Sequence, residues 1–297
     1  MKILLAGCNG QVGCEICRKA PGYELDVVAT DINNLDITDI DAIRKLQAKH
    51  QADIVVNAAA YTAVDRAETD SQIAYDVNAL GAQNLAITAG EYNLPILHVS
   101  TDYVFSGTAS SPYRDDAEPD PRSVYGATKL AGEQLVAKAN PRHLTLRTSW
   151  VFGIDGQNFV KTMLRLSNEQ DEINVVSDQF GSPTFAGHIA TALLKLTKQY
   201  QQTGELLWGN YNFCDRDATN WHQFAEKIMQ LGLENGLITS TPVVQPILTE
   251  DYPTPATRPL YSVMDCSRFE QIFPHIGISS WESGLREMIA FLSGTGK

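Results

Sequence analysis

The sequence predicts an α/β protein built on a doubly wound parallel sheet, with a second and smaller C-terminal domain. In the first half, short apolar runs alternate with stretches whose apolar residues recur at helical spacing. These runs are apolar throughout, as strands buried on both faces of a parallel sheet are. After Trp150 this rhythm loosens, and prolines gather between Pro242 and Pro259, which indicates a change of architecture.

The expected elements of the first half alternate between strand and helix. The first strand, residues 2–6, is the run K-I-L-L-A, and a glycine turn separates it from a helix over residues 11–20. Further strands are expected at 25–30, 53–57, 95–100 and 144–148, because each run is apolar and bounded by polar or turn-forming residues. Further helices are expected at 39–50, 71–92 and 124–138, the second of them broken near Gly81.

In the second half, helices are expected at 158–166, 189–200, 221–232 and 280–292, and a strand at 210–214. We interpret this half as a smaller domain that lays loops over the carboxyl ends of the sheet strands. The last residues, 294–297, are expected to form a frayed end.

Composition narrows the class of protein. The formal net charge of -12 over 297 residues argues against non-specific binding to nucleic acid or to an anionic membrane. The apolar stretch Ile3–Ala6 is too short for a signal peptide, and no apolar run is long enough to cross a bilayer. The odd count of five cysteines, with nothing that suggests export, predicts reduced thiols and a cytoplasmic protein.

Metal and thiol chemistry are the less favoured interpretations. Cys14 and Cys17 form a C-x-x-C at the start of a helix, where redox pairs occur, but small residues also pack well there. The six histidines show no ligand-like spacing, so we expect no catalytic metal.

A glycine-rich turn predicts a dinucleotide site. Gly7, Gly10 and Gly13 directly follow a strand and open a helix, where backbone can approach a pyrophosphate closely. Asp31 ends the second strand at the distance expected of a carboxylate that binds the adenosine ribose, which favours NADH over a 2′-phosphate. The alternative is that Asp31 merely caps a turn with Asn33 and Asn34.

From the glycine turn and Asp31 we expect residues 1–150 to form a Rossmann-type dinucleotide-binding domain. Residues 151–297 are then mainly substrate-binding, with some segments returning to the Rossmann sheet.

Tyr125 and Lys129 form the pattern Y-x-x-x-K on one face of a predicted helix. An ammonium near a phenol stabilises the phenolate, so this spacing predicts a lowered pKa for Tyr125. A tyrosine tuned in this way is a general acid or base. The spacing arises often by chance, but here it follows a glycine turn, a ribose-binding carboxylate and Thr101 at the end of strand four.

This set of residues resembles the extended short-chain dehydrogenase/reductase family, whose members act mainly on nucleotide-activated sugars. The resemblance covers nearly the whole chain. It implies that Thr101 hydrogen-bonds the substrate oxygen and that Tyr125 gives or takes the proton. It implies further that Lys129 holds the ribose and tunes Tyr125.

The segment S-T-D-Y-V-F separates branches of that family. In the 4,6-dehydratases the corresponding sequence is T-D-E, whose acid pair eliminates water. Here Asp102 is present but Tyr103 occupies the glutamate position, so we expect simple ketone reduction. Tyr103 lacks a lysine partner and is interpreted as a sugar contact or, alternatively, as an aromatic side chain at the edge of the core.

Longer motifs resemble the branch that reduces the 4-keto group of dTDP-4-dehydro-L-rhamnose to dTDP-L-rhamnose, the last step of dTDP-rhamnose biosynthesis. They include N-A-A-A-Y-T-A-V-D-R-A-E, Y-G-A-T-K-L-A-G-E, R-T-S-W-V-F-G and Y-P-T-P-A-T-R-P. The resemblance implies either NADPH or NADH as cofactor, held by Gly10, Gln11, Val12, Asp31, Asp36, Ile37, Ala60, Tyr61, Thr62, Lys129 and the main chain near Val99. It implies substrate contacts from Thr101, Asp102, Tyr125 and Trp150.

Four further positions carry weaker expectations. Trp150 directly follows strand five, so its ring could stack on a sugar; burial in the core is the alternative. Arg258, in the proline-rich segment, could pair with a diphosphate, the alternative being a solvated arginine. Asp178 and Gln179 are expected to order a loop near the same pocket.

One departure concerns a metal. Some members of the family build a metal-bridged dimer with a glutamate on the first helix, matched here by Glu15, and a second one where this chain has Gly187. Magnesium dependence and that dimer are therefore doubtful, and we expect a monomer or a homodimer.

Two alternative functions remain open at this point. One is a reductase or epimerase of another nucleotide sugar. The other is non-enzymatic, a regulatory subunit of methionine adenosyltransferase, which the intact set of Thr101, Tyr125 and Lys129 disfavours.

Overall fold

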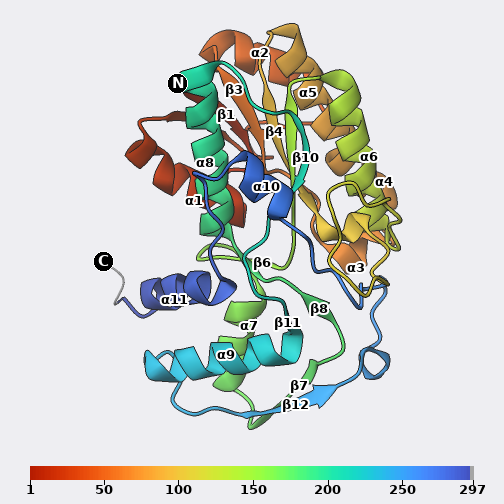
Figure 1. The fold of residues 1–297 in the computed structure, drawn as a ribbon, viewed down its shortest axis with the longest axis vertical. Coiled ribbons are helices and arrows are strands. Elements are labelled where there is room, and N and C mark those ends of the chain that lie inside the picture. Colours follow the sequence, from red (N-terminus) through yellow and green to blue (C-terminus); the bar gives the residue numbers. More distant parts are fainter. Residues whose placement is uncertain (295–297) are drawn as a thin grey trace.

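A computed structural model describes residues 1–294. Its centre is a parallel sheet of six strands in the order β2-β1-β3-β4-β5-β10, so the predicted fold class is confirmed (Figure 1). The strands are β1 (Lys2–Ala6), β2 (Asp26–Thr30), β3 (Ile54–Asn57), β4 (Ile96–Thr101), β5 (His143–Thr148) and β10 (Gly209–Asn212). The strand order reverses at β1, which pairs with β2 on one side and with β3 on the other. The frayed end expected at 294–297 falls, beyond Gly294, outside the described residues.

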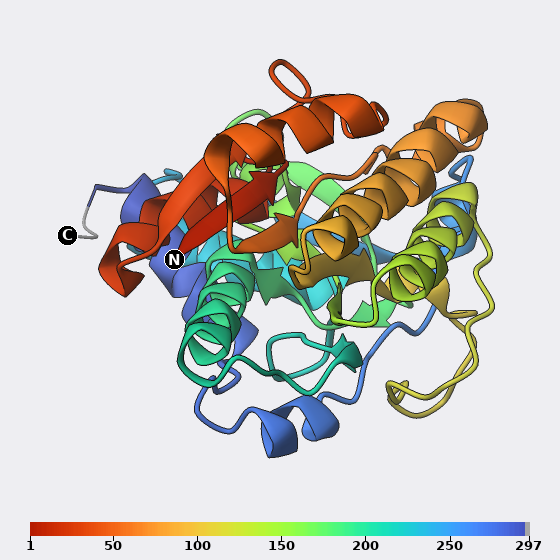
Figure 2. The same cartoon turned by 90° about the horizontal axis from the view of Figure 1, so that it is seen from above.

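Helices cover both faces of this sheet, as Figure 2 shows from above. Ile3 and Leu5 of β1 face a core shared with α1 (Gln11–Lys19) and α8 (Ala186–Thr203). Leu4 and Ala6, the alternate residues, face a second core. The helices of that second face are α2 (Ile40–His50), α5 (Ala82–Glu91) and α6 (Val124–Ala139). Burial on both faces explains why the central strands β1 and β3 are almost entirely apolar, whereas the edge strand β2 has exposed positions and β10 has the sequence G-N-Y-N.

A second lobe lies below the carboxyl ends of the strands (Figure 1). Its core is aromatic and aliphatic, with Phe224 and Trp281 fully or nearly buried. Its helices are α7 (Phe159–Ser167), α9 (Trp221–Glu234) and α11 (Trp281–Leu292), and its parallel pair is β7 (Glu172–Val176) with β12 (Val243–Ile247). This pair was not predicted, because Pro246 disfavours a strand; a two-stranded sheet tolerates it, since both strands are edges.

Short elements complete the second half of the chain. Two further two-stranded pairs join β6 (Val151–Phe152) to β9 (Thr184–Phe185), and β8 (Phe180–Gly181) to β11 (Thr219–Asn220). The helix α10 (Ser267–Ile272) returns to the first lobe, where Phe269 packs against Tyr211 of β10. Helix α3 (Val64–Ala67) follows β3.

The helix expected over residues 71–92 is interrupted, as predicted near Gly81. It begins as α4 (Ser71–Tyr75), passes through a π-helical turn over Asp76–Gly81, and continues as α5. A Cβ at Gly81 would lie 2.6 Å from Ile37 Cγ1, so glycine allows this turn to pack closely against the segment after β2. Wider turns of this kind occur often at functional sites.

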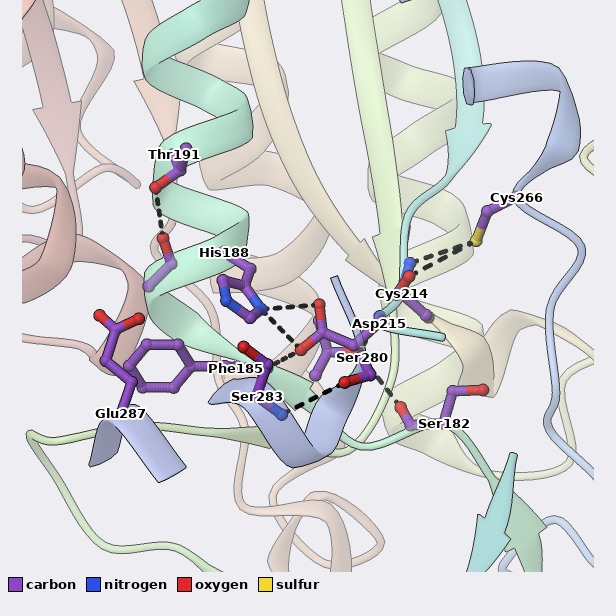
Figure 3. A network of polar contacts seen from close by, with 12 residues as sticks. Ser182, Phe185, His188, Thr191, Cys214, Asp215, Cys266, Ser280, Ser283 and Glu287 are labelled. Atoms are coloured by element: carbon purple, nitrogen blue, oxygen red, sulfur yellow. Dashed lines mark hydrogen bonds and ion pairs between the residues drawn. The ribbon is translucent and has the colours of Figure 1, made fainter. Parts of the chain in front are cut away.

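A buried carboxylate holds the junction of the two lobes together (Figure 3). Asp215, which follows β10, accepts hydrogen bonds from Phe185 N at 3.0 Å and from His188 Nδ1 at 2.8 Å, both at the start of α8. Next to it, the Ser280 hydroxyl caps α11 by accepting from Ser283 N. Within residues 1–294, no helix combines the length and the hydropathy that a membrane span needs.

Candidate active site

A cavity of about 280 Å³ opens where the strand order reverses, beyond the ends of β1, β2 and β3. Open α/β sheets bind ligands at this point, because the loops that leave adjacent strands diverge there. Seven of the predicted cofactor residues line it: Gly7, Gly10, Asp31, Asp36, Ile37, Ala60 and Tyr61. Gly7 adopts φ +83°, and a Cβ there would lie 2.6 Å from Ala59 N. Only glycine therefore lets the turn after β1 approach the loop after β3 so closely.

Asp31 takes part in a turn, as one interpretation of the sequence proposed, and it also lines the cavity, as ribose binding requires. Its Oδ2 accepts from Asn9 N at 3.0 Å, which fixes the glycine turn, while Oδ1 accepts from Ile32 N. Asn34 Oδ1 in turn accepts from Asp31 N at 2.7 Å, as the turn-capping alternative proposed. The carboxylate nevertheless lines the cavity. It is therefore placed both to hold the turn and to meet a ribose.

The other predicted cofactor residues are not part of the lining of this cavity. Gln11, Val12 and Gly13 form the first turn of α1, whose free N–H groups are a ready site for a phosphate. The side chain of Gln11 is used elsewhere: it donates to Val151 O at 3.3 Å and accepts from Asn158 Nδ2 at 2.9 Å, in the second lobe. Thr62 is exposed.

The predicted catalytic residues converge at the end of β4. Thr101 is the last residue of the strand, and its hydroxyl donates to Asp102 Oδ1 at 3.0 Å. Helix α6 brings Tyr125 to the same place, because Gly126 leaves room for the Tyr103 carbonyl directly against the helix. The Tyr103 and Tyr125 rings meet edge to face with centroids 5.4 Å apart. Thr101, Asp102, Tyr103 and Tyr125 therefore form one cluster.

The pKa of Tyr125 differs from the sequence-based expectation. Burial raises it above its usual range, the hydroxyl of Thr101 opposes this as a hydrogen-bond partner, and the charge of Asp102 adds to it. Lys129, fully buried, donates Nζ to Val99 O at 2.7 Å, and burial lowers its own pKa to about 8. The lowered Tyr125 pKa predicted from Y-x-x-x-K is thus not found, and Tyr125 stands as a neutral phenol.

Asp102 is a buried carboxyl whose pKa burial raises to about 6. The neighbouring hydroxyls of Ser262 and Thr101 oppose that shift. Thr101 donates to Oδ1 at 3.0 Å, whereas Oδ2 is buried and has no hydrogen-bond partner among the described residues. A carboxyl with this pKa changes its protonation state close to neutral pH.

Tyr103 and Arg258 are paired with each other. Arg258 donates Nη1 to the Tyr103 hydroxyl at 3.2 Å and Nη2 to Asp65 Oδ2 at 2.8 Å. Burial raises the pKa of Tyr103 to about 12, with Arg258 opposing, so this tyrosine keeps its proton. Arg258 is therefore neither simply solvated nor free: two of its five N–H donors are engaged inside the protein.

The comparisons with known proteins agree with this geometry. A family model described as the RmlD substrate binding domain matches residues 1–293. The chain belongs to this family.

Its relatives cover it from end to end. A dTDP-4-dehydrorhamnose reductase from Aggregatibacter actinomycetemcomitans is 38% identical over 98% of this chain and 99% of its own. A crystal structure of a dTDP-4-dehydrorhamnose reductase from Clostridium acetobutylicum superimposes with a TM-score of 0.90 at 38% identity, covering 98% of this chain and 99% of that one. The reductase from Bacillus anthracis, solved in complex with NADP, gives 0.87 at 34% identity over 98% of this chain and 99% of its own. The predicted resemblance is thus confirmed.

The ring of Trp150 already has an aromatic neighbour in the structure. Its indole stacks on Trp221 of α9, with centroids 3.6 Å apart and planes 5° from parallel. Gly181 also packs against it, since a Cβ there would lie 2.5 Å from Trp150 Cε2. Trp221 is fixed in turn by a hydrogen bond from Nε1 to Gln179 Oε1 at 3.2 Å. In this member of the family, one face of the indole belongs to a tryptophan pair, and only what remains exposed can meet a ligand.

Asp178 and Gln179 bind one residue of the segment that follows β12. Asp178 accepts from Thr249 N at 2.9 Å and from Thr249 Oγ1 at 2.7 Å. Gln179 Nε2 donates to the same hydroxyl at 3.1 Å. Because Gln179 also holds Trp221, these contacts link the tryptophan pair to that segment.

Two positioning residues escaped the sequence-based prediction. Asn78 is buried in the π-helical turn. It accepts from Tyr61 N at 2.8 Å and donates to Thr128 Oγ1 at 3.1 Å, so it joins the loop after β3 to α6. Glu68 accepts from Val124 N at 2.9 Å and so caps the helix that carries Tyr125. Glu68 lies within the quoted motif N-A-A-A-Y-T-A-V-D-R-A-E, and that motif was the only signal that could have found it.

The structure shows the surroundings of Cys14 and Cys17, the possible redox pair, and of Glu15, the possible metal ligand. Burial raises the pKa values of Cys14 and Cys17, the opposite of what a reactive redox pair requires. Glu15 is 1% exposed and bonded to Arg18 at 2.5 Å, with Lys19 Nζ at 3.9 Å. Among residues 1–294, no group of three or more His, Cys, Asp or Glu side chains is arranged to hold a metal ion.

Proposed function

We propose that this chain reduces the 4-keto group of dTDP-4-dehydro-L-rhamnose to give dTDP-L-rhamnose, using NADPH or NADH. The observation that carries the proposal is the convergence of Thr101 and Tyr125 at the end of β4, on the same carboxyl edge of the parallel sheet as the cavity at the strand-order reversal. The chain's full-length similarity to dTDP-4-dehydrorhamnose reductases supports the choice of substrate.

The cavity fits a dinucleotide. The missing Cβ at Gly7, the first turn of α1 and the carboxylate of Asp31 provide close backbone approach, phosphate-binding N–H groups and a ribose acceptor. Lys129 would hold the second ribose from its place beside Val99. The bound cofactor supplies the hydride for the reduction.

The chain's own residues then handle the proton. The Tyr125 hydroxyl, kept neutral by its raised pKa, donates its proton to the oxygen that becomes an alkoxide. The Thr101 hydroxyl has one hydrogen, which in the structure is donated to Asp102 Oδ1 over an oxygen–oxygen distance of 3.0 Å. To orient the substrate oxygen, this hydrogen turns from Asp102 to that oxygen. Elimination of water is disfavoured, because Tyr103 stands in the glutamate position and its pKa of about 12 keeps it protonated.

We place this reaction in the cytoplasm and take a monomer or homodimer as the working form. All five cysteines are free thiols, which suits a reducing compartment.

The test is a spectrophotometric assay with dTDP-4-dehydro-L-rhamnose and either NADPH or NADH, in parallel with and without EDTA. We expect cofactor oxidation matched by dTDP-L-rhamnose, identified by mass spectrometry and proton NMR, and no loss with EDTA. Folded protein that binds cofactor but consumes none would overturn the proposal. A purified protein with retained, recycled cofactor would point to an epimerase, and co-purification with a synthetase to a regulatory subunit.

A further inference from the structure

We propose that Asp65 is a positioning residue of this site: it acts through Arg258 to aim the Tyr103 hydroxyl at the sugar. The proposal rests on the proposed function and deepens it, because it assigns Tyr103 the role of a fixed hydrogen-bond donor to the substrate. It also assigns a role to the proline-rich segment of residues 252–262, here called the strap.

Among residues 1–294, the side-chain hydrogen bonds of Asp65 are made with the strap. Its Oδ2 accepts from Arg258 Nη2 at 2.8 Å, and its Oδ1 accepts from Ala256 N at 3.3 Å. Asp65 itself belongs to α3, which directly follows the cofactor loop after β3. A single carboxylate therefore joins the cofactor side of the site to a segment that is 191 and 193 residues further along the chain.

The strap crosses between the two lobes. In Figure 1 the chain runs from β12 in the lower lobe, past α3, and up to α10. Main-chain hydrogen bonds fix its second half: Tyr261 N donates to Gly107 O, Phe180 N to Leu260 O, and Ser262 N to Phe180 O. Its first half is largely exposed, with Tyr252 59% exposed, and Asp65 supplies two contacts that hold it.

The hydrogen bond that Arg258 donates to Tyr103 leaves the Tyr103 O–H free to donate a hydrogen bond of its own. A phenolic oxygen that accepts from a guanidinium still has its own O–H to donate. The adjacent positive charge polarises that O–H bond, while the pKa of about 12 prevents its loss. The Tyr103 ring lies edge to face against the ring of Tyr125, so both tyrosines belong to one site. Tyr103 is thus suited to hold the sugar and Tyr125 to protonate it.

The ion pair between Asp65 and Arg258 is expected to contribute little to the stability of the fold. Their side chains are 38% and 30% exposed, and ion pairs in such settings contribute little to folding. The same pair in front of a binding site can still restrict where Arg258 and Tyr103 point. Asp65→Asn should therefore alter the site much more than the fold.

The experiment is a double-mutant cycle of Asp65→Asn and Tyr103→Phe, with Asp41→Asn as control. Asp41 also pairs with an arginine, Arg44, but on the exposed surface of α2. We expect Asp65→Asn to lower kcat/KM for the sugar about tenfold, mainly through KM, as loss of one charged hydrogen bond would. In the Tyr103→Phe background the same change should cost less than about twofold, because no hydroxyl remains to be aimed. Cofactor affinity and the unfolding midpoint should stay unchanged in every variant.

Two results would overturn the proposal. One is an equal loss from Asp65→Asn in both backgrounds, which would mean that Asp65 does not act through Tyr103. The other is unchanged amide hydrogen exchange at residues 252–258 in Asp65→Asn, where we expect faster exchange, with residues 261 and 262 as the unaffected reference. Exchange needs no turnover. Failure of the wild-type assay would thus reject the reductase function and the role of Tyr103 in it, while the exchange data decide whether Asp65 holds the strap.

Discussion

The rings of Tyr103 and Tyr125 lie edge to face, 5.4 Å apart, but their hydroxyls have different partners. The Thr101 hydroxyl lowers the pKa of Tyr125 against the effect of burial, whereas the Tyr103 hydroxyl accepts a hydrogen bond from Arg258 at 3.2 Å. We therefore propose separate roles for the two tyrosines: the one beside Thr101 moves the proton, and the one beside a guanidinium holds a fixed position.

The first prediction separates these two roles. Tyr125→Phe should lower turnover by about 10²–10⁴-fold, since a positioned general acid contributes that much. Tyr103→Phe should cost about tenfold, as the loss of one hydrogen bond does. Both variants should bind NADPH as the wild type does, measured by fluorescence titration. Near-normal turnover in Tyr125→Phe would refute the assignment of the proton to this residue.

The second prediction concerns the glycine turn. Gly7→Ala places a methyl group 2.6 Å from Ala59 N at a φ of +83°, so either the turn or the loop after β3 must move. NADPH affinity should fall at least about tenfold, because a non-glycine residue at such a φ is itself strained by 1–2 kcal/mol. Gly22→Ala is the matched control, since a Cβ at Gly22 meets nothing within 4 Å. Equal dissociation constants for the two variants would show that the cofactor does not lie in this cavity.

The sequence predicted the parts of the site that depend on strand ends. Gly7, Asp31 and Thr101 each end or follow an apolar run, and parallel strands bring their carboxyl ends to one edge. Once the sheet is assumed, the convergence of these residues follows. The helix that carries Tyr125 and Lys129 is likewise recognisable from its local pattern.

What the sequence could not predict depends on contacts between distant segments. Trp150 stacks on Trp221, 71 positions later, and Arg258 finds Asp65 only because the strap returns across the site. No local periodicity encodes either pairing. The lowered pKa expected for Tyr125 failed for a related reason: burial, which comes from the whole fold, outweighs a lysine four residues away whose Nζ is bonded to Val99 O.

The third prediction concerns the start of α6. Glu68 accepts from Val124 N at 2.9 Å, where a carboxylate satisfies a free N–H and suits the positive end of the helix. Glu68→Ala should lower the free energy of unfolding by about 1 kcal/mol and reduce kcat, because Tyr125 is the next residue. Glu68→Gln keeps a hydrogen-bond acceptor and should recover most of the free energy of unfolding and most of kcat. Glu205→Ala, at an exposed position after α8, is the control, and a loss of the same size there would remove any special role for Glu68.

The fourth prediction uses the buried carboxyl of Asp102. Its pKa in the folded protein is about 6, above the value of about 3.9 for an unfolded aspartate. The folded state therefore holds this proton more tightly, so the carboxyl favours folding most at low pH. That contribution is lost as pH rises from about 4 through 6, and amounts to about 3 kcal/mol for a shift of this size.

Asp102→Asn removes this titration while it keeps the shape of the side chain. Urea unfolding of both proteins without cofactor should show that asparagine gains stability relative to aspartate between pH 4 and pH 7.5, by up to about 3 kcal/mol. The difference between the two proteins cancels the titration of every other carboxylate. A constant difference across this range would mean that Asp102 ionises in the folded protein as it does in the unfolded chain. Its neighbours Thr101 and Ser262 would then have to solvate the charge far better than two hydroxyls ordinarily do.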